Sequence, residues 1–248
     1  MESSNLLVVM PVMNLWKQYT VPCIRSLAKY DFLLIDNASV DETVTEAPKA
    51  VKYYKRNEQN IGCGRSWNYG INFGRRFGYK YIFVINNDTL FAEDTVEELV
   101  GRMERGGVIM VTAHNVGNGS ELVKPDVISE TEHPDFSAFL IKSDFFDIVG
   151  EFDEGFYPAY FEDNDMHYRI LLAGEKAIAY DPAVYIHYGS KTQNQKPGGV
   201  VNGSAFVKNR AYFIKKWGGP PGRETFKHPF NDPTKSLKWT LQMERSHG

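Results

Sequence analysis

The stretch Y-I-F-V-I-N-N-D-T-L-F at residues 81–91 is the one around which the chain is organised. Its first five residues, Tyr81–Ile85, form a continuous apolar run, which is typical of a strand buried on both faces of a parallel sheet. The run stops at Asn86, Asn87 and Asp88, which would stand at the carboxyl end of the strand. Ligands bind at that end of the strands in open α/β sheets, so the pattern predicts a ligand site. A polar turn that leads into a helix N-cap would give the same residues.

Strands and helices are expected to alternate on both sides of this stretch. Apolar runs predict strands at 6–10, 32–35 and 108–112, and residues 52–55 could form a further strand. Helices are expected at 21–29, 65–77 and 93–105. Such alternation is typical of a mostly parallel sheet with right-handed crossovers. The second half is less regular, with strands expected at 136–141, 176–180 and 184–186 and helices at 142–149, 161–173 and 204–217.

Three of the early strands end in polar residues, at Asp36, Asn57 and Asn86. Parallel strands bring these ends to one edge of the sheet, which favours a ligand site over a simple turn. Asp88 adds a hard oxygen ligand suited to Mg²⁺ or Mn²⁺, ions that usually bridge one or two carboxylates to substrate phosphates.

Composition and length indicate a globular protein. The chain has 248 residues, 42% hydrophobic and 14% aromatic, and its net charge of −3 argues against a general nucleic-acid coat. Cys23 and Cys63 form no C-x-x-C pair, so we expect reduced thiols. The N-terminal apolar run is too short for a signal peptide, and no stretch approaches the length of a membrane span. The sequence therefore predicts a soluble, cytoplasmic protein.

Five motifs, in this order, resemble the family 2 glycosyltransferases. They are L-L-V-V-M-P at 6–11, F-L-L-I-D-N-A-S-V-D-E-T at 32–43, N-E-Q-N-I-G-C-G-R-S-W-N-Y-G-I at 57–71, V-I-N-N-D-T at 84–89 and V-G-E-F-D-E-G-F-Y-P-A-Y-F-E-D-N-D-M-H-Y-R at 149–169. The resemblance covers roughly residues 6–190. It implies an inverting enzyme that uses nucleotide sugars, on a GT-A fold.

The resemblance also implies the architecture. We expect an α/β, Rossmann-like fold, with a mostly parallel central sheet flanked by helices and a small mixed second sheet. Residues 1–203 would form the GT-A domain, and residues 204–248 a C-terminal helix and an extended tail packed on the same domain.

A nucleotide-sugar donor, with UDP or dTDP favoured, is the ligand that the resemblance implies for the strand ends. The implied donor-binding residues are Pro11, Asp36, Asn60, Arg65, Asn68, Asn86 and Asn87. A carboxylate such as Asp36 suits ribose hydroxyls and ring N–H groups because it only accepts hydrogen bonds. Asp36 could instead form an Asx-turn, and Arg65 could be a solvated surface residue rather than a phosphate ligand.

Asn86-Asn87-Asp88 stands where the family has its D-x-D motif, with Asn86 in place of the first acid. The resemblance implies that Asp88 binds Mn²⁺ or Mg²⁺ and that His187, in Y-I-H-Y-G-S, completes the metal site or touches the diphosphate. Neutral imidazole suits Mn²⁺ better than Mg²⁺. A histidine beside tyrosines can also be a satisfied core residue.

Asp163 occupies the position of the family's general base, and Glu162 and Tyr160 are implied to contact the acceptor. The aromatic run 156–161 would form a wall on which a sugar stacks. The helix dipole alone could explain acids at a helix start, and it would stabilise the ionised Asp163. Asp153 is expected to be a structural turn residue.

We therefore expect a metal-dependent inverting glycosyltransferase that acts on an acceptor hydroxyl. The acceptor class stays open between a glycan, a lipid-linked sugar, a protein and a modified nucleic acid, and its choice is expected to lie in loops 115–134 and 193–203. A non-catalytic nucleotide-sugar-binding protein is the first alternative. A sugar nucleotidyltransferase is the second, although 10–16 lacks the Gly-rich, basic loop that would hold a triphosphate.

Overall fold

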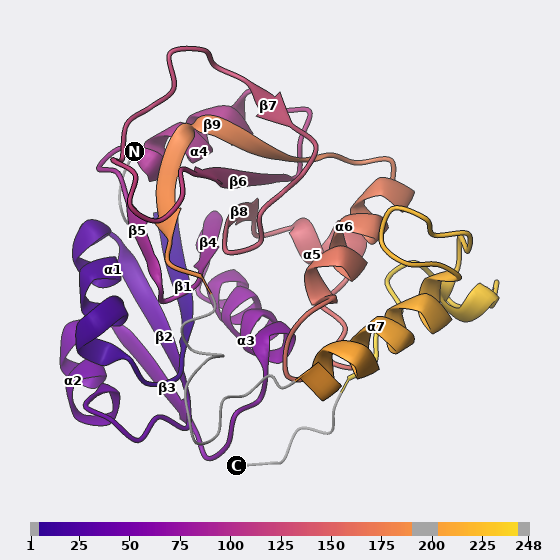
Figure 1. Cartoon of the computed structure of the whole chain (residues 1–248), viewed down its shortest axis with the longest axis horizontal. Helices are drawn as coiled ribbons and strands as arrows, with labels where there is room; N and C mark the ends of the chain where they lie inside the picture. Colours follow the sequence, from indigo (N-terminus) through magenta and orange to yellow (C-terminus); the bar gives the residue numbers. More distant parts are fainter. Residues whose placement is uncertain (1–4, 190–202, 243–248) are drawn as a thin grey trace.

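The computed structural model describes residues 5–189 and 203–242 (Figure 1). In these residues, nine strands form one sheet in the order β3-β2-β1-β4-β8-β6-β9-β5, with β7 paired to β9. The strands are β1 (Leu6–Val12), β2 (Asp31–Asn37), β3 (Tyr53–Asn57), β4 (Tyr81–Ile85), β5 (Thr89–Phe91), β6 (Met110–Asn115), β7 (Glu130–Thr131), β8 (Ala138–Lys142) and β9 (Ala177–His187). The helices are the π-helix η2 (Trp16–Thr20), α1 (Val21–Ser26), α2 (Thr43–Ala50), α3 (Cys63–Arg76), α4 (Thr95–Glu104), α5 (Phe145–Val149), α6 (Glu162–Leu172), α7 (Gly203–Trp217) and the 3₁₀ turn η3 (Pro229–Asn231).

The first four strands of the sheet order are all parallel, as the alternating sequence pattern predicts. β1 pairs with β2 and β4, and β2 pairs with β3. All five residues of β4 are buried, so the apolar run at 81–85 is a strand covered on both faces. The ends of β1, β2 and β4 consequently meet at one edge of the sheet.

The later strands continue the same sheet and do not form a separate small one. β8 runs antiparallel to both β4 and β6, and it joins the parallel half to β6 and β9. The small mixed second sheet expected from the sequence is therefore continuous with the central sheet.

β9 is one strand where the sequence predicts two. Between the two expected strands lies Pro182, which cannot donate a ladder hydrogen bond. The register between β6 and β9 shifts between Ala113 and His114, opposite this part of β9, and the irregularity accommodates the proline. The continuous strand then pairs with β5, which places His187 opposite Thr89.

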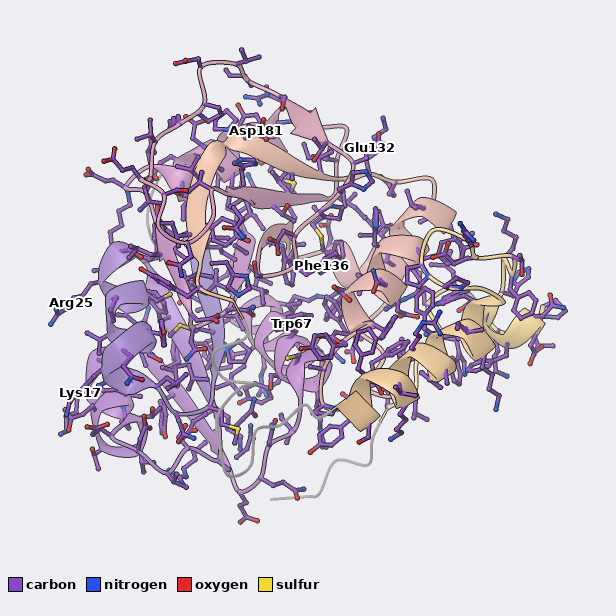
Figure 2. The ribbon with its side chains drawn as sticks, viewed as in Figure 1. Lys17, Arg25, Trp67, Glu132, Phe136 and Asp181 are labelled. Carbon is purple, nitrogen blue, oxygen red and sulfur yellow. The ribbon has the colours of Figure 1, made fainter. Side chains whose placement is uncertain are left out.

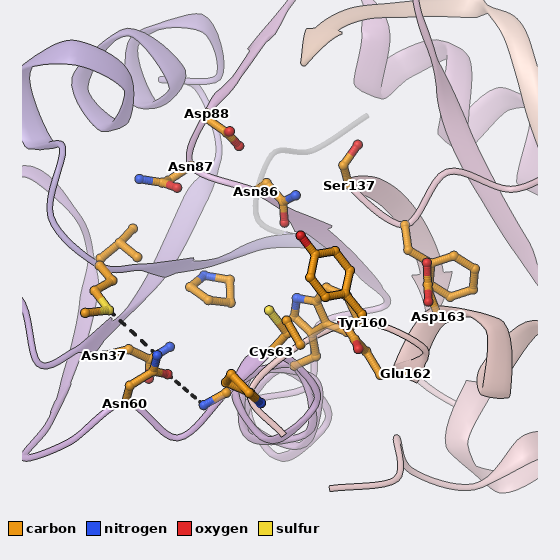
Figure 3. A pocket seen from close by; sticks show the side chains of 18 of the residues that line it. Asn37, Asn60, Cys63, Asn86, Asn87, Asp88, Ser137, Tyr160, Glu162 and Asp163 are labelled. Atoms are coloured by element: carbon orange, nitrogen blue, oxygen red, sulfur yellow. Dashed lines mark hydrogen bonds between the residues drawn. The ribbon is translucent and has the colours of Figure 1, made fainter. Parts of the chain in front are cut away.

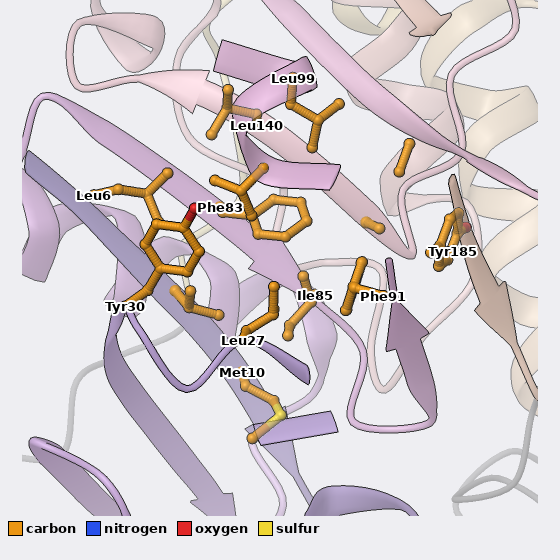
Figure 4. Packing of buried hydrophobic residues seen from close by; sticks show 14 of the residues in the cluster. Leu6, Met10, Leu27, Tyr30, Phe83, Ile85, Phe91, Leu99, Leu140 and Tyr185 are labelled. Atoms are coloured by element: carbon orange, nitrogen blue, oxygen red, sulfur yellow. The ribbon is translucent and has the colours of Figure 1, made fainter. Parts of the chain in front are cut away.

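Helices cover both faces of the sheet. On one face, Leu27, which follows α1, and Leu99 of α4 pack with Leu6 and Phe83 of the strands (Figure 4). On the other face, α3 approaches closely because it carries glycine at Gly70, where a Cβ would lie 2.2 Å from a methyl group of Val9. Figure 2 shows Trp67 of α3 and Phe136 in the middle of the molecule.

α7 packs beside α6 at one end of the molecule (Figure 1). Phe213 and Trp217 of α7 share a buried cluster with Phe156, Phe161 and Tyr168. Residues 190–202 lie outside the described residues. They include most of the expected loop 193–203 and adjoin the expected domain boundary at residue 203. Of the helices that the structure describes, none has the length and apolar character that a membrane span requires.

Candidate functional site

A cavity of about 280 Å³ opens at the carboxyl ends of β1, β2 and β4 (Figure 3). It is lined by Pro11, Val12, Met13, Asn37, Asn60, Gly62, Cys63, Trp67, Asn86, Asn87, Asp88, Asp135, Phe136, Ser137, Pro158, Ala159, Tyr160, Glu162, Asp163 and His187. Asp88 lies on one side of this cavity, and Glu162 and Asp163 lie on the other. The site therefore has two acidic poles with room for a small ligand between them.

Asp88 and His187 form the first pole. The Nε2 atom of His187 lies 3.2 Å from Oδ1 of Asp88, because β5 and β9 pair next to these residues. The backbone N–H of Tyr188 also donates to the carbonyl oxygen of Asp88 at 2.9 Å. Burial lowers the pKa of His187, but the hydrogen bond and the charge of Asp88, with a contribution from Asp135, outweigh burial and raise it.

A divalent cation fits the chemistry of this pole. Asp88 offers a buried carboxylate, 4% exposed, and His187 offers an imidazole nitrogen. Within residues 5–189 and 203–242 no group of three or more His, Cys, Asp or Glu side chains could hold a metal by itself. Two protein ligands are what a Mg²⁺ or Mn²⁺ ion needs when substrate phosphates supply other ligands.

Asn86 and Asn87 both line the cavity but have different partners. The Nδ2 atom of Asn86 lies 3.4 Å from Nε2 of His187, so this amide sits beside the first pole. Asn87 donates through Nδ2 to Oγ1 of Thr20 at 3.1 Å, which ties the turn after β4 to η2.

Asn60 and Pro11 also line the cavity, as the sequence predicts for a donor site. The side chain of Asn60 accepts a hydrogen bond from the N–H of Gly62 at 2.8 Å, which shapes the loop before α3. Gly62 has φ +84°, and a Cβ there would lie 2.9 Å from the carbonyl oxygen of Pro158. Glycine at this position therefore lets the loop approach the segment around Pro158 closely.

Asp36 does not line the cavity. Its side chain is fully buried and accepts hydrogen bonds from the N–H of Ser39 at 2.8 Å and from the hydroxyl of Tyr54 at 2.8 Å. The Arg56 guanidinium lies 3.5 Å away. The Asp36 carboxylate thus holds the turn after β2, and the neighbouring residue Asn37 lines the cavity.

Asn68 and Arg65 likewise lie behind the cavity lining. Asn68 is buried and exchanges two hydrogen bonds with the backbone of Phe152, at 2.9 Å and 2.7 Å. Nε of Arg65 lies 3.9 Å from a carboxylate oxygen of Glu154. Both side chains therefore join α3 to the loop that follows α5, and neither contacts the cavity directly.

Glu162 and Asp163 form the second pole, at the first turn of α6. The preceding residues Tyr160 and Phe161 both have left-handed backbone conformations, with φ of 75° and 74°, which turn the chain sharply before the helix. Glu162 is 5% exposed, and its Oε2 atom has no hydrogen-bond partner in the part of the chain that the structure describes. Burial, and then the charge of Asp163, raise the pKa of Glu162 well above its ordinary value.

Asp163 also has a raised pKa, chiefly because burial disfavours its charged form. Backbone hydrogen bonds lower the pKa in part, including the N–H of Asn164 at 2.8 Å from Oδ1. The sequence predicts the opposite balance, in which the helix N-terminus dominates. The correction follows from the depth of the second pole, which the sequence pattern does not reveal.

Asp135 is a cavity residue that none of the sequence motifs identifies. Its carboxylate accepts hydrogen bonds from the hydroxyls of Tyr185 and Ser137, each at 2.7 Å. Its charge contributes to the raised pKa values of both Asp163 and His187, so it acts on both poles. The available signal was weak, because Asp135 follows a long polar stretch and precedes β8.

Known proteins resemble this chain in sequence and in fold. The sequence profile described as Glycosyl transferase family 2 matches residues 7–155. A galactofuranosyl glycosyltransferase of Leishmania donovani is 33% identical over 110 residues, which are 44% of this chain and 24% of that protein, so the chain matches about a quarter of the relative's length.

Two solved structures share the fold at low sequence identity. The structure of GalNAc-T7 with UDP, GalNAc and Mn²⁺ superimposes with a TM-score of 0.64 and 14% identity, over 86% of this chain and 48% of that one. The structure of S. aureus TarS 1–349 in complex with UDP gives a TM-score of 0.57 and 15% identity, over 73% of this chain and 59% of that one.

Proposed function

The chain belongs to glycosyl transferase family 2, and we propose that it is a metal-dependent, inverting glycosyltransferase that moves a sugar from a nucleotide-sugar donor to an acceptor hydroxyl. The observation that carries this proposal is the cavity at the strand ends, with Asp88 and His187 at one pole and Glu162 and Asp163 at the other. A UDP-linked donor is favoured, because two proteins of similar fold are described in complex with UDP.

The nucleotide would lie against the ends of β1 and β2, where Pro11, Asn37 and Asn60 line the cavity. Asn86 and Asn87 would complete the donor site. Three of the residues expected to bind the donor would support the site without touching the nucleotide: Asp36, Asn68 and Arg65. Their hydrogen bonds and ion pairs hold the end of β2 and the loops beside the proposed nucleotide site.

Asp88 and His187 would hold Mn²⁺ or Mg²⁺. When bound, the ion would supply positive charge against the diphosphate of the donor, which carries increasing negative charge as it leaves. The structure of GalNAc-T7, which shares this fold, contains Mn²⁺ together with UDP, and this supports the choice of ion. Imidazole as a ligand favours Mn²⁺ over Mg²⁺.

Asp163 acts as the general base. Its carboxylate removes the proton from the acceptor hydroxyl as the hydroxyl oxygen attacks the anomeric carbon, and the bond from that carbon to the diphosphate oxygen breaks. The raised pKa of Asp163 makes the carboxylate a stronger base than a solvated aspartate. A single displacement from the opposite face inverts the configuration at the anomeric carbon.

Tyr160 and Glu162 would contact the acceptor beside Asp163. Tyr160 presents an aromatic ring at the cavity, and sugars can stack on such a surface. The raised pKa of Glu162 favours its protonated form, which can donate a hydrogen bond as well as accept one.

The test is release of nucleoside diphosphate from a panel of UDP-, dTDP- and GDP-sugars, with and without Mn²⁺. The first donors to try carry N-acetylglucosamine, N-acetylgalactosamine and galactofuranose. We expect Mn²⁺-dependent release of UDP from at least one UDP-sugar, with an inverted anomer in the product by NMR. Binding of UDP without turnover of any sugar would contradict the enzymatic proposal and support the non-catalytic alternative.

A further inference from the structure

Helix α7 lies outside the part of the chain that matches the family profile, yet it is bonded to the segment that carries the second pole. That segment runs from Asp153 to Asp165 and includes Tyr160, Glu162 and Asp163. Three buried side chains of α7 form hydrogen bonds or ion pairs with it: Asn209, Lys216 and Trp217.

Lys216 holds both ends of this segment. Its Nζ atom lies 2.6 Å from Oδ2 of Asp153 and 2.7 Å from Oδ1 of Asp165, and all three side chains are fully buried. Asp153 stands before the aromatic run, and Asp165 lies in the first turn of α6, two residues after Asp163. One ammonium group therefore fixes the distance between the two ends of the segment.

The other contacts of the two aspartates make the arrangement rigid. Trp217 donates through Nε1 to Oδ1 of Asp165 at 2.8 Å, and Nε of Arg169 lies 2.9 Å from Oδ2 of the same carboxylate. Asp153 also accepts from the hydroxyl of Tyr212 at 3.1 Å. The two carboxylates, Lys216 and Arg169 balance in charge, which a fully buried ionic group requires.

Asn209 holds the middle of the segment through its backbone. Its Nδ2 group donates to the carbonyl oxygen of Ala159 at 2.8 Å and contacts that of Tyr160 at 3.3 Å. Asn209 is fully buried. Ala159 and Tyr160 line the cavity, and Tyr160 is the first of the two consecutive residues with left-handed backbone. The side chain of Asn209 thus supports the turn that precedes Glu162.

We propose that Asn209 and Lys216 are positioning residues for the acceptor side of the reaction, which fix where Tyr160, Glu162 and Asp163 stand in the cavity. This inference rests on the proposed function, because it takes Asp163 as the base. Proton transfer needs the base within hydrogen-bond reach of the attacking hydroxyl, and a misplacement of about 1 Å can lower the rate by roughly 10²-fold. Neither residue lines the cavity, so both act through the segment that they hold.

The experiment compares Lys216→Met and Asn209→Leu with Lys215→Met, a matched control at an exposed position of the same helix. Asn209→Leu leaves the ionic group intact, so it serves if Lys216→Met does not fold. The measurements are UDP affinity with Mn²⁺, melting temperature, and turnover of the UDP-sugar that the wild-type protein consumes fastest. Turnover is measured at a temperature well below the melting temperatures of all variants.

We expect turnover to fall by about 10²-fold in the variants of Asn209 and Lys216 while UDP affinity stays within about twofold and Lys215→Met behaves as wild type. Each substitution should cost little further turnover in an Asp163→Asn background, because residues that act through one base are not additive. A lowered melting temperature with wild-type turnover would show a purely structural role and overturn the inference. Full additivity with Asp163→Asn would also overturn it.

Hydrogen–deuterium exchange separates this inference from the proposed function. Asn209→Leu should speed exchange at amides 159–165 while the amides of β1, β2 and β4 exchange as in the wild type. If the wild-type protein binds UDP but turns over no nucleotide sugar, the proposed function fails and the exchange result alone judges the positioning role. Unchanged exchange at 159–165 would then overturn it.

Discussion

His187 Nε2 lies 3.2 Å from Asp88 Oδ1, although the two residues are far apart in the chain. The antiparallel pairing of β5 with β9, which sets Thr89 opposite His187, brings them together. Strand β9 therefore brings the imidazole nitrogen of His187 next to the carboxylate of Asp88, which follows β4. This relationship is the basis of the proposed metal site.

Asp88→Ala should abolish the Mn²⁺-dependent part of UDP binding and leave the fold intact, because Asp88 lies beyond the end of β4 and belongs to none of the hydrophobic core clusters. Titration calorimetry of UDP with and without Mn²⁺ measures this directly. Asp126→Ala, at an exposed position, is the control. If Mn²⁺ still increases the affinity of Asp88→Ala for UDP as it does in wild type, Asp88 is not the metal ligand.

Asp36→Ala should cost stability rather than nucleotide affinity. Removing the buried carboxylate leaves the N–H of Ser39 and the hydroxyl of Tyr54 without their acceptor, at a cost of about 1.5–3 kcal/mol in the free energy of unfolding. Asn37→Ala should lower UDP affinity as well as stability, because Asn37 lines the cavity and its amide also bonds Ser66 and Asn57. Denaturant unfolding and UDP titration are measured on both variants. A loss of UDP affinity in Asp36→Ala but not in Asn37→Ala would indicate that Asp36 contacts the nucleotide directly.

Glu162→Gln should be more stable than wild type at neutral pH. The folded-state pKa of Glu162 is raised above its ordinary value of 4.5, so the folded protein keeps a proton that the unfolded chain releases as the pH rises past 4.5. Wild type therefore loses stability relative to Glu162→Gln from about pH 4.5 upward, until the folded-state pKa is passed. Denaturant unfolding across this range measures the difference, and a difference independent of pH would contradict the raised pKa of Glu162.

Much of the fold could be predicted because its strands carry strong local signals. The apolar run at 81–85 gave β4 with its correct bounds, and the alternation of strands and helices gave the parallel half of the sheet. β5 was missed because it has only three residues, and β9 was divided in two at Pro182. The register shift between β6 and β9 leaves residues 181–183 of β9 unpaired with β6, which accommodates that proline. No local sequence pattern reveals this pairing.

The site was predictable where position in a motif matters and less so where the direction of a side chain matters. Motif order placed Asp88, His187, Glu162 and Asp163 at one cavity. It did not distinguish Asp36 from Asn37, because successive side chains of a strand point to opposite faces. Only the tertiary structure shows which of the two faces the cavity.

Lys216 shows the limit of sequence patterns most clearly. A lysine near the end of an amphipathic helix is expected to be solvated, yet this one is fully buried. Its burial depends on Asp153 and Asp165, which lie far away in sequence and approach it only after α7 packs on α6. A sequence pattern that considers each helix separately cannot predict the ion pairs of Lys216 with Asp153 and Asp165.

The central claim is that Asp163 is the catalytic base, and Asp163→Asn tests it most directly. The substitution preserves the size of the side chain but removes its ability to take a proton. The measurement is the rate of UDP release from the UDP-sugar that the wild-type protein turns over, with UDP affinity measured on the same sample and Asp144→Asn as an exposed control. We expect turnover to fall by about 10²–10⁴-fold with UDP affinity nearly unchanged. Near-normal turnover in Asp163→Asn would contradict the claim.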